Sequence, residues 1–179
     1  LSFIIALVWS FFIVHNEEEN KKKLYDKKFT VPMFLYRCRL AIKNFVLIAV
    51  LTAVSLYLIG DNFFSFEHLS VLPFLLCFLT MVVIDDICFY AIPRLMHSTQ
   101  LLYKNIHAVH HRAIPPIPMD YLFAHPIEAL GAAFGLVIGI GVLIIATGTA
   151  NIYVLGVYSF YRTIHELCVH SGFVIIPEK

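Results

Sequence analysis

The feature that most constrains this chain is a series of long apolar runs. Five runs occupy residues 1–14, 41–60, 71–92, 129–147 and 151–169. Four of them approach the roughly 20 residues that a helix needs to cross the hydrocarbon core of a bilayer. Backbone groups in lipid must be hydrogen-bonded within their own segment, and the runs lack the alternating polarity of barrel strands. We therefore predict an all-α integral membrane protein with about four transmembrane helices, preceded by one that is cut at the N-terminus.

The composition agrees with a membrane setting. The 179 residues are 60% hydrophobic and 14% charged, with a mean hydropathy of +0.82, which is more apolar than a soluble domain of this length. A net charge of +1 gives no broad basic surface, so nucleic acid is not an expected partner. The four cysteines form no CxxC pair and predict no disulfide framework.

Three glycines recur within the fourth run. Gly131, Gly135 and Gly139 are four residues apart and therefore share one helix face. The spacing indicates either a seam where two helices pack closely or glycines tolerated at the lipid surface.

The basic residues are gathered in the connection between the first two runs. They are Lys21, Lys22, Lys23, Lys27, Lys28, Arg37 and Arg39, whereas 61–70 and 148–150 contain no Lys or Arg. The positive-inside rule therefore places the basic loop in the cytosol. Counting crossings from that loop puts every histidine cluster on the cytosolic side as well.

A histidine-rich stretch follows the third run. His107, His110 and His111 stand at i, i+3 and i+4, so on a helix their imidazoles share one face and can converge on a metal. The alternative is a solvated interfacial stretch in which these histidines lie between Lys104 and Arg112. The neighbouring motifs favour the metal site.

Two acidic residues lie inside the third run, where ionisable groups are costly and usually functional. Asp86 precedes His97 by eleven residues on the same helix face, which continues through Tyr90 and Pro93. We expect Asp85 or, with better reason, Asp86 to hydrogen-bond to a metal-binding histidine. The alternative is a carboxylate shallow enough to reach the membrane surface.

Two more histidines lie at the edges of later runs. His170 follows the fifth run, and Gly172 allows the chain to turn sharply there. Glu166, one turn earlier, is placed to accept the second imidazole proton of His170. A plain helix-ending histidine is the alternative. His125 precedes Pro126 at an expected helix start, so it is equally a metal ligand or a helix cap.

Such a set of imidazoles has a chemical rationale. Neutral nitrogen ligands suit iron and leave positions open for dioxygen, while carboxylates fix the imidazole tautomers from outside. Breaking an unactivated C–H bond needs a reduced metal in a dry pocket. His15 and His68 have no partner at ligand spacing and are expected to be ordinary interfacial residues.

The order of these motifs resembles the fatty acid hydroxylase and sterol desaturase superfamily, most closely its sterol C4-methyl oxidase branch. The matching stretches are Asp86 with Tyr90, 94–97, 102–104, 106–111 (Ile-His-Ala-Val-His-His), 124–128 (Ala-His-Pro-Ile-Glu), 162–164 and 169–173 (Val-His-Ser-Gly-Phe). Together they cover about residues 85–177. We expect residues 71–179 to form a hydroxylase-like domain truncated at its C-terminal end, and residues 1–70 to supply N-terminal membrane helices and the basic loop.

The resemblance implies a di-iron (Fe²⁺) monooxygenase of the endoplasmic reticulum that oxidises a sterol methyl group, or a related fatty-acyl lipid, with dioxygen. Cytochrome b5 and an NAD(P)H-dependent reductase would supply the electrons. The implied metal ligands are His97, His107, His110, His111 and His170, with His125 as a further candidate and Asp86, Tyr90 and Glu166 around them.

Two departures from the family pattern bear on activity. The first histidine box should begin four residues before His97, where this chain has Pro93, which offers no donor atom and should kink the helix. The family also has a further histidine motif past the position of Lys179, and it carries acidic residues where this chain has His165 and Cys168. The alternatives are a pseudoenzyme that keeps the scaffold and binds lipid or one metal and, less favoured, a zinc transporter with histidines along its path.

Overall fold

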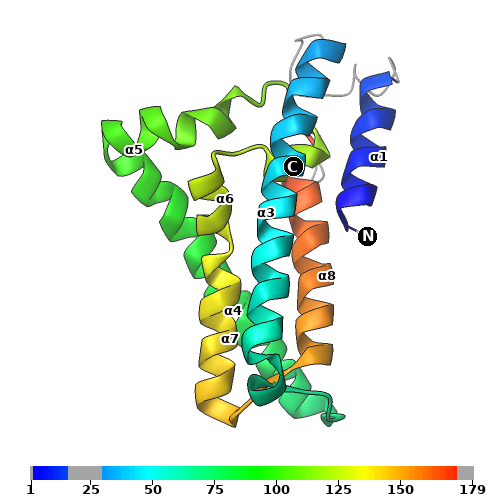
Figure 1. The fold of residues 1–179 in the computed structure, drawn as a ribbon, viewed down its shortest axis with the longest axis vertical. Coiled ribbons are helices and arrows are strands. Elements are labelled where there is room, and N and C mark those ends of the chain that lie inside the picture. The colour runs from blue at the N-terminus through cyan, green and yellow to red at the C-terminus, as the bar shows by residue number, and fades with distance from the viewer. Residues whose placement is uncertain (1, 16–29, 173–179) are drawn as a thin grey trace, which may run out of the picture.

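A computed structural model describes residues 2–15 and 30–172, most of them helical (Figure 1). The helices are α1 (Ser2–His15), α3 (Val31–Phe63), α4 (Val71–Ser98), α5 (Gln100–Asn105), α6 (Pro126–Ala132), α7 (Phe134–Thr147) and α8 (Ile152–Val169), with 3-10 helices η1 (His107–Arg112) and η2 (Pro118–Leu122). Two short strands, β1 (Phe64–Ser65) and β2 (Ala150–Asn151), pair in parallel. The predicted helical class is confirmed.

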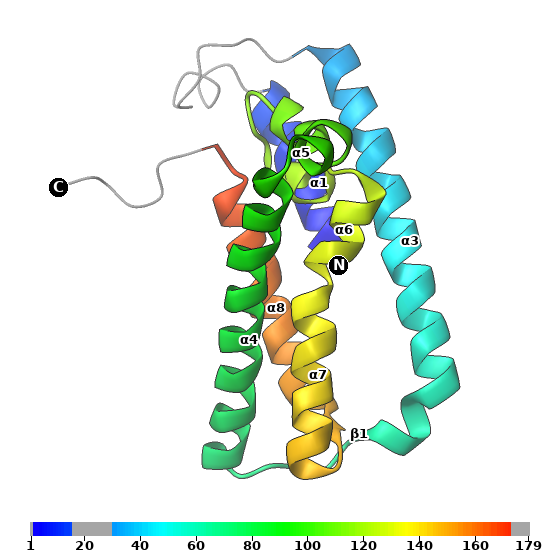
Figure 2. The same cartoon turned by 90° about the vertical axis from the view of Figure 1, so that its left-hand side faces the viewer.

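Three stretches among the described residues are long and apolar enough to cross a membrane. They are Val31–Leu58 in α3, Val71–Ser98, and Pro126–Thr147 across α6 and α7. The last run forms α8, which stands beside α4 and α7 (Figure 2) but is not one of the three. Arg162, His165 and Glu166 make its second half polar. The fourth crossing therefore stays a prediction.

The helix α3 begins well before its apolar run, at Val31. Arg37, which the sequence assigned to the basic loop, is instead buried in this helix, with Nη1 2.8 Å from Oδ2 of Asp120. Asn44 is also buried and donates to two backbone carbonyls of the segment 112–124, at 2.9 and 2.8 Å. Because distant acceptors bind the Arg37 guanidinium and the Asn44 side-chain NH₂ group, the helix extends through a stretch that hydropathy alone reads as loop.

The glycine spacing marks a packing seam between α7 and α4. Gly131, Gly135 and Gly139 are all buried. A Cβ at position 135 would lie 2.1 Å from Oδ1 of Asp85, and one at position 139 would lie 2.8 Å from Sδ of Met81. The seam interpretation is confirmed and the lipid-facing one is wrong. The adjoining core contains Met81, Leu143, Ala150, Leu155 and Tyr158.

The molecule has two distinct ends. One end holds α5, η1, η2, the start of α6 and the end of α8, together with the end of α1 and the start of α3 (Figures 1 and 2). At the other end β1 pairs with β2, and Asn151 caps α8 while donating to the carbonyl of Glu67 at 2.7 Å. The histidine-rich segments thus share an end with the two helices that flank the basic loop. The loop's lysines, Lys21 to Lys28, lie outside the described residues.

Candidate metal centre

The HxxHH stretch forms the 3-10 helix η1, where the sequence predicted an ordinary helical face. In a 3-10 helix residues i and i+3 eclipse each other. The rings of His107 and His110 accordingly lie nearly parallel, 20° apart, with centroids 6.0 Å from each other. The ring of His111 lies perpendicular to that of His107, with centroids 4.6 Å apart. The three imidazoles therefore face two neighbouring positions rather than one.

The first position is formed by His97, His107 and His111. His97 is in the last turn of α4, and its Nε2 lies 3.2 Å from Nε2 of His111. Each of the three offers a ring nitrogen, and these nitrogens all lie within 4.8 Å of one another. Two nitrogens bound to one metal at about 2.1 Å lie about 3.0–3.4 Å apart, so the 3.2 Å between the Nε2 atoms of His97 and His111 suits a shared ion, with a nitrogen of His107 close by.

The second position lies between His110 and His170, whose ring centroids are 5.3 Å apart. His170 terminates α8, and Gly172 follows with a positive φ of 76°. A Cβ at Gly172 would lie 2.8 Å from the carbonyl oxygen of Pro116, so both the backbone angle and the space require glycine. The turn predicted after His170 is present.

Hydrogen bonds orient three of these rings in the same way. At Nδ1, His107 is 2.7 Å from Oε1 of Glu128, His110 is 3.1 Å from the carbonyl oxygen of Phe123, and His170 is 2.8 Å from the carbonyl oxygen of Glu166. Because a carbonyl or carboxylate oxygen accepts, Nδ1 is the protonated nitrogen in each ring. Nε2 therefore keeps its lone pair, as a metal-binding imidazole requires.

Burial favours the same neutral state. It lowers the pKa values of His107, His110 and His111, and it lowers the pKa of His170 to about 4. Neighbouring imidazoles add to the lowering in all four. These rings are thus uncharged at neutral pH, and a cation can approach them without first displacing protons.

The five histidines line one cavity of about 350 Å³. Most of its remaining walls are apolar side chains of α4, α6 and α8: Phe89, Ile92, Pro93, Met96, Ala129, Ala132 and Val169. Pro93 is therefore exposed to the same space as the histidines, at the position where the resemblance expects another one. The helix α4 continues past it to Ser98.

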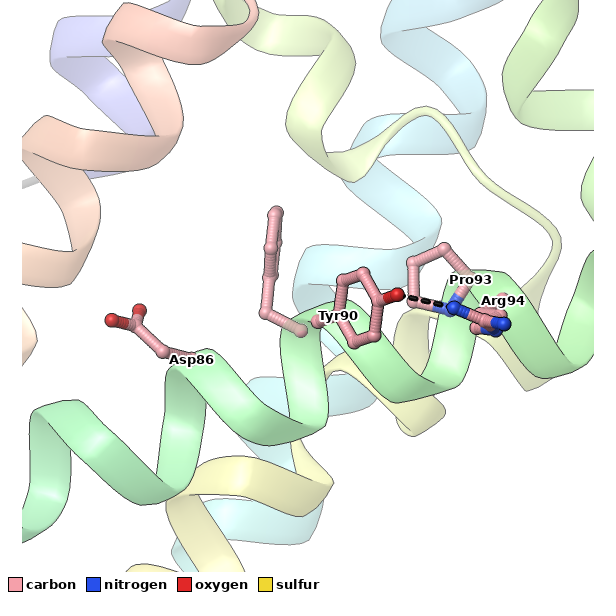
Figure 3. Close-up of a pocket in the computed structure, with 5 residues that line it drawn as sticks. Asp86, Tyr90, Pro93 and Arg94 are labelled. Atoms are coloured by element: carbon pink, nitrogen blue, oxygen red, sulfur yellow. Dashed lines mark hydrogen bonds between the residues drawn. The ribbon is translucent and has the colours of Figure 1, made fainter.

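Asp86 and Tyr90 do not line this cavity. They lie on an exposed face of α4, where they form a groove with Phe89, Pro93 and Arg94, and the Tyr90 hydroxyl is hydrogen-bonded to Arg94 (Figure 3). Nothing in the described residues joins Asp86 to a histidine. The predicted hydrogen bond from Asp86 to a metal-binding histidine is therefore not supported by this geometry.

The carboxylate hydrogen-bonded to His107 is Glu128, which the sequence analysis did not single out. It lies in the first turn of α6, and its Oε2 is buried without a hydrogen-bond partner among the described residues. The His-Pro-Ile-Glu motif was the signal that could have found it. His125, the other candidate in that motif, caps α6 by accepting from the amide of Ile127 at 3.2 Å, and it does not line the cavity.

Of the remaining candidate residues, only Glu166 lies beside a histidine of the cavity. Glu166 does lie beside His170, with Oε2 3.5 Å from Nδ1, although its backbone carbonyl is the nearer acceptor. His165 stacks on Tyr161, and neither His165 nor Cys168 lines the cavity. His68 stacks on Tyr153 at the far end, and His15 is hydrogen-bonded to the carbonyl of Phe11.

Comparisons with known proteins agree with the motifs. The sequence profile of the fatty acid hydroxylase family matches residues 78–178. Methylsterol monooxygenase 1 of Gallus gallus is 36% identical over 93 residues, which are 52% of this chain and 29% of that protein. Methylsterol monooxygenase 2-1 of Arabidopsis thaliana is 33% identical over 91 residues, covering 51% of this chain and 31% of that protein.

A longer match is to a relative named for a different activity. Very-long-chain aldehyde decarbonylase GL1-11 of Oryza sativa subsp. japonica is 27% identical over 152 residues, which are 83% of this chain and 55% of that protein. The chain thus spans between 29% and 55% of the length of these three relatives. No solved structure is detectably similar.

Proposed function

Because this chain belongs to the fatty acid hydroxylase family, we propose that it is an iron-dependent membrane monooxygenase that oxidises a methyl group of a sterol or a related lipid. The observation that carries the proposal is the shared orientation of His107, His110 and His170. Each keeps Nδ1 on an oxygen acceptor and leaves Nε2 for a metal in one cavity.

We propose two iron positions in that cavity. His97, His107 and His111 would hold one ion, and His110 with His170 would contribute to the other. Bound iron would supply the activation of dioxygen and the cleavage of the C–H bond. Glu128 fixes the tautomer of His107, and apolar side chains form most of the wall beside the proposed iron positions.

The surroundings of the cavity support a substrate taken from the bilayer. The groove on α4, about 600 Å³ in volume, shares Phe89 and Pro93 with the cavity (Figure 3). Since α4 is one of the membrane-crossing candidates, an apolar molecule in the lipid could reach the histidines past these two residues without entering water.

We further propose that the protein lies in the endoplasmic reticulum membrane with its histidine end in the cytosol. Cytochrome b5 and its NAD(P)H-dependent reductase would then supply two electrons. With two protons from the solvent, one oxygen atom of dioxygen would enter the substrate while the other leaves as water. The family resemblance supports the donors. The position of the histidines, at the end where α1 finishes and α3 starts, supports the orientation.

A second candidate function rests on Pro93. Because Pro93 faces the cavity without a donor atom, the chain would in this case bind lipid or a single metal without turnover. Pro93→His separates the two candidates. A pseudoenzyme limited by this residue should gain bound metal and turnover, whereas an active enzyme that has adapted to proline should gain neither.

The main test uses purified protein in detergent. Iron content is measured by mass spectrometry, and oxidation of a radiolabelled 4-methyl sterol is measured with cytochrome b5, the reductase, NADH and oxygen. We expect iron and product in the wild type and a loss of both in His107→Ala. His68→Ala, which changes a histidine at the far end, should keep both. A wild type that binds iron no better than His107→Ala would overturn the proposal.

A further inference from the structure

A charged side chain outside the histidine cluster connects three of the helices around the cavity. Arg162 lies in α8, two turns before His170. Its Nε is 3.0 Å from Oδ2 of Asp85 in α4, and one of its terminal nitrogens donates to the carbonyl oxygen of Ala132, the last residue of α6, at 2.5 Å. The same nitrogen is 3.9 Å from Oε1 of Glu166.

The carbonyl of Ala132 needs such a partner because α6 ends there. The last carbonyls of a helix have no amide one turn further on, and they carry partial negative charge. A guanidinium has five N–H donors in a fixed plane and can serve a carboxylate and a carbonyl together. Arg162 therefore fixes the junction of α6 and α7 against both α4 and α8.

Each of the connected elements carries a group at the cavity. The helix α4 ends with His97, α6 begins with Glu128, and Glu166 in α8 accepts the Nδ1 proton of His170 through its backbone carbonyl. We propose that Arg162 is a positioning residue of the metal centre, because its guanidinium sets the relative places of the three helices that bring these groups together. The inference rests on the metal centre proposed above.

The space for this ion pair depends on a residue of another helix. A Cβ at Gly135 in α7 would lie 2.1 Å from Oδ1 and 2.8 Å from Cα of Asp85. An added methyl group at 135 would therefore displace both the Asp85 carboxylate and the α4 backbone that carries it away from Arg162, while every charged group is kept. Gly141, in the same helix, has nothing within 4 Å of its Cβ position and offers a matched control.

The test measures metal binding and ligand geometry rather than turnover. Purified wild type, Arg162→Gln, Arg162→Lys, Gly135→Ala and Gly141→Ala are titrated with Co²⁺, whose visible absorption reports the ligand set and its geometry. We expect about 10–100-fold weaker binding and a changed spectrum in Arg162→Gln, the range found when partners of metal ligands are removed. Gly135→Ala should give the same change, Arg162→Lys should recover part of the affinity, and Gly141→Ala should match the wild type.

The outcomes separate this inference from the function on which it rests. If the wild type binds Co²⁺ no better than His107→Ala, the metal centre itself is refuted. If the wild type binds and Gly135→Ala and Arg162→Gln keep its affinity and spectrum, only the role of Arg162 is refuted. A lower melting temperature with an unchanged spectrum would also refute it, since that is the signature of a purely structural ion pair. Should Arg162→Gln fail to fold, Gly135→Ala and Arg162→Lys decide.

Discussion

The contact between α4 and α7 depends on glycines, which have no side chain to keep the two helices apart. The contact between α3 and residues 112–124 depends instead on polar side chains that are buried. In the first, Gly135 and Gly139 let two backbones approach. In the second, Arg37 and Asn44 reach across to Asp120 and to backbone carbonyls. We call these contacts the glycine seam and the polar joint.

The difference follows from what each contact has to hold. The glycine seam joins two regular helices, whose backbone groups are already paired, so close van der Waals packing is enough. The polar joint holds a segment with only short 3-10 turns, whose backbone carbonyls need outside donors. This segment follows the HxxHH stretch and has little regular structure of its own, so specific polar partners must fix it.

The largest loss of stability is expected when the charge of Arg37, at the centre of the polar joint, is removed. Arg37→Ala removes the buried guanidinium that lies 2.8 Å from Oδ2 of the buried Asp120, and we expect the free energy of unfolding to fall by about 3–5 kcal/mol. Thermal or denaturant unfolding of the detergent-solubilised protein measures this. Arg39→Ala, a change in the same helix at a less buried position, should shift stability by less than about 0.5 kcal/mol. Equal effects of the two variants would remove the polar joint as an explanation.

Substitutions of Glu128 test whether its hydrogen bond to His107 contributes to metal binding. Glu128→Ala removes the acceptor for Nδ1 of His107, and Co²⁺ or Fe²⁺ affinity should fall about 10–100-fold. Glu128→Gln keeps an acceptor oxygen and should lose less. Glu67→Ala, an exposed acidic residue at the far end, is the control. Unaltered metal affinity in Glu128→Ala would mean that the hydrogen bond to His107 has no part in metal binding.

Asn44 probes the polar joint without involving a charge. Asn44→Ala removes the donor that the carbonyls of Leu122 and Ala124 share, and we expect a loss of about 2 kcal/mol in unfolding free energy. Hydrogen exchange should increase in residues 118–124 and stay constant in α4 and α7. A uniform increase in hydrogen exchange across the molecule would indicate that Asn44 stabilises the whole fold and not residues 118–124 in particular.

Within the glycine seam, Gly139 should give the smallest change in unfolding free energy. Alanine at 139 gains about 1 kcal/mol in helix propensity but crowds the flexible side chain of Met81, so we expect a net loss of about 1 kcal/mol. Gly141→Ala has the propensity gain without the clash and should be slightly stabilising. If Gly139→Ala proved as stable as Gly141→Ala, the seam would have to be looser than described.

The sequence was informative about this molecule wherever the signal is local. Apolar length predicted the membrane helices, the four-residue glycine spacing offered the seam as one of two interpretations, and Gly172 marked a real turn with positive φ. The spacing of the HxxHH stretch placed three histidines together, although their 3-10 form directs them to two positions.

The sequence was least informative where a residue's environment is set by a distant partner. Arg37 and Asp120 are 83 positions apart, so charge counting read the arginine as part of a loop. Similarly, Asp86 has the spacing of a histidine partner, but Glu128, 21 positions after His107, has the contact. Helical periodicity cannot reveal which of two carboxylates the chain will bring to a site.

The long helix α3 has a mechanical consequence. It is fixed at one end by Arg37 and Asn44 and at the other by the strand β1 that follows it, while its stretch 50–58 is exposed. A helix of 33 residues is about 50 Å long, so a tilt of about 5° would displace one end against the other by roughly 4 Å. A displacement of this size would break the contacts of Arg37 and Asn44 or the pairing of β1 with β2. The tilt of α3 in the bilayer is therefore linked to the position of η2.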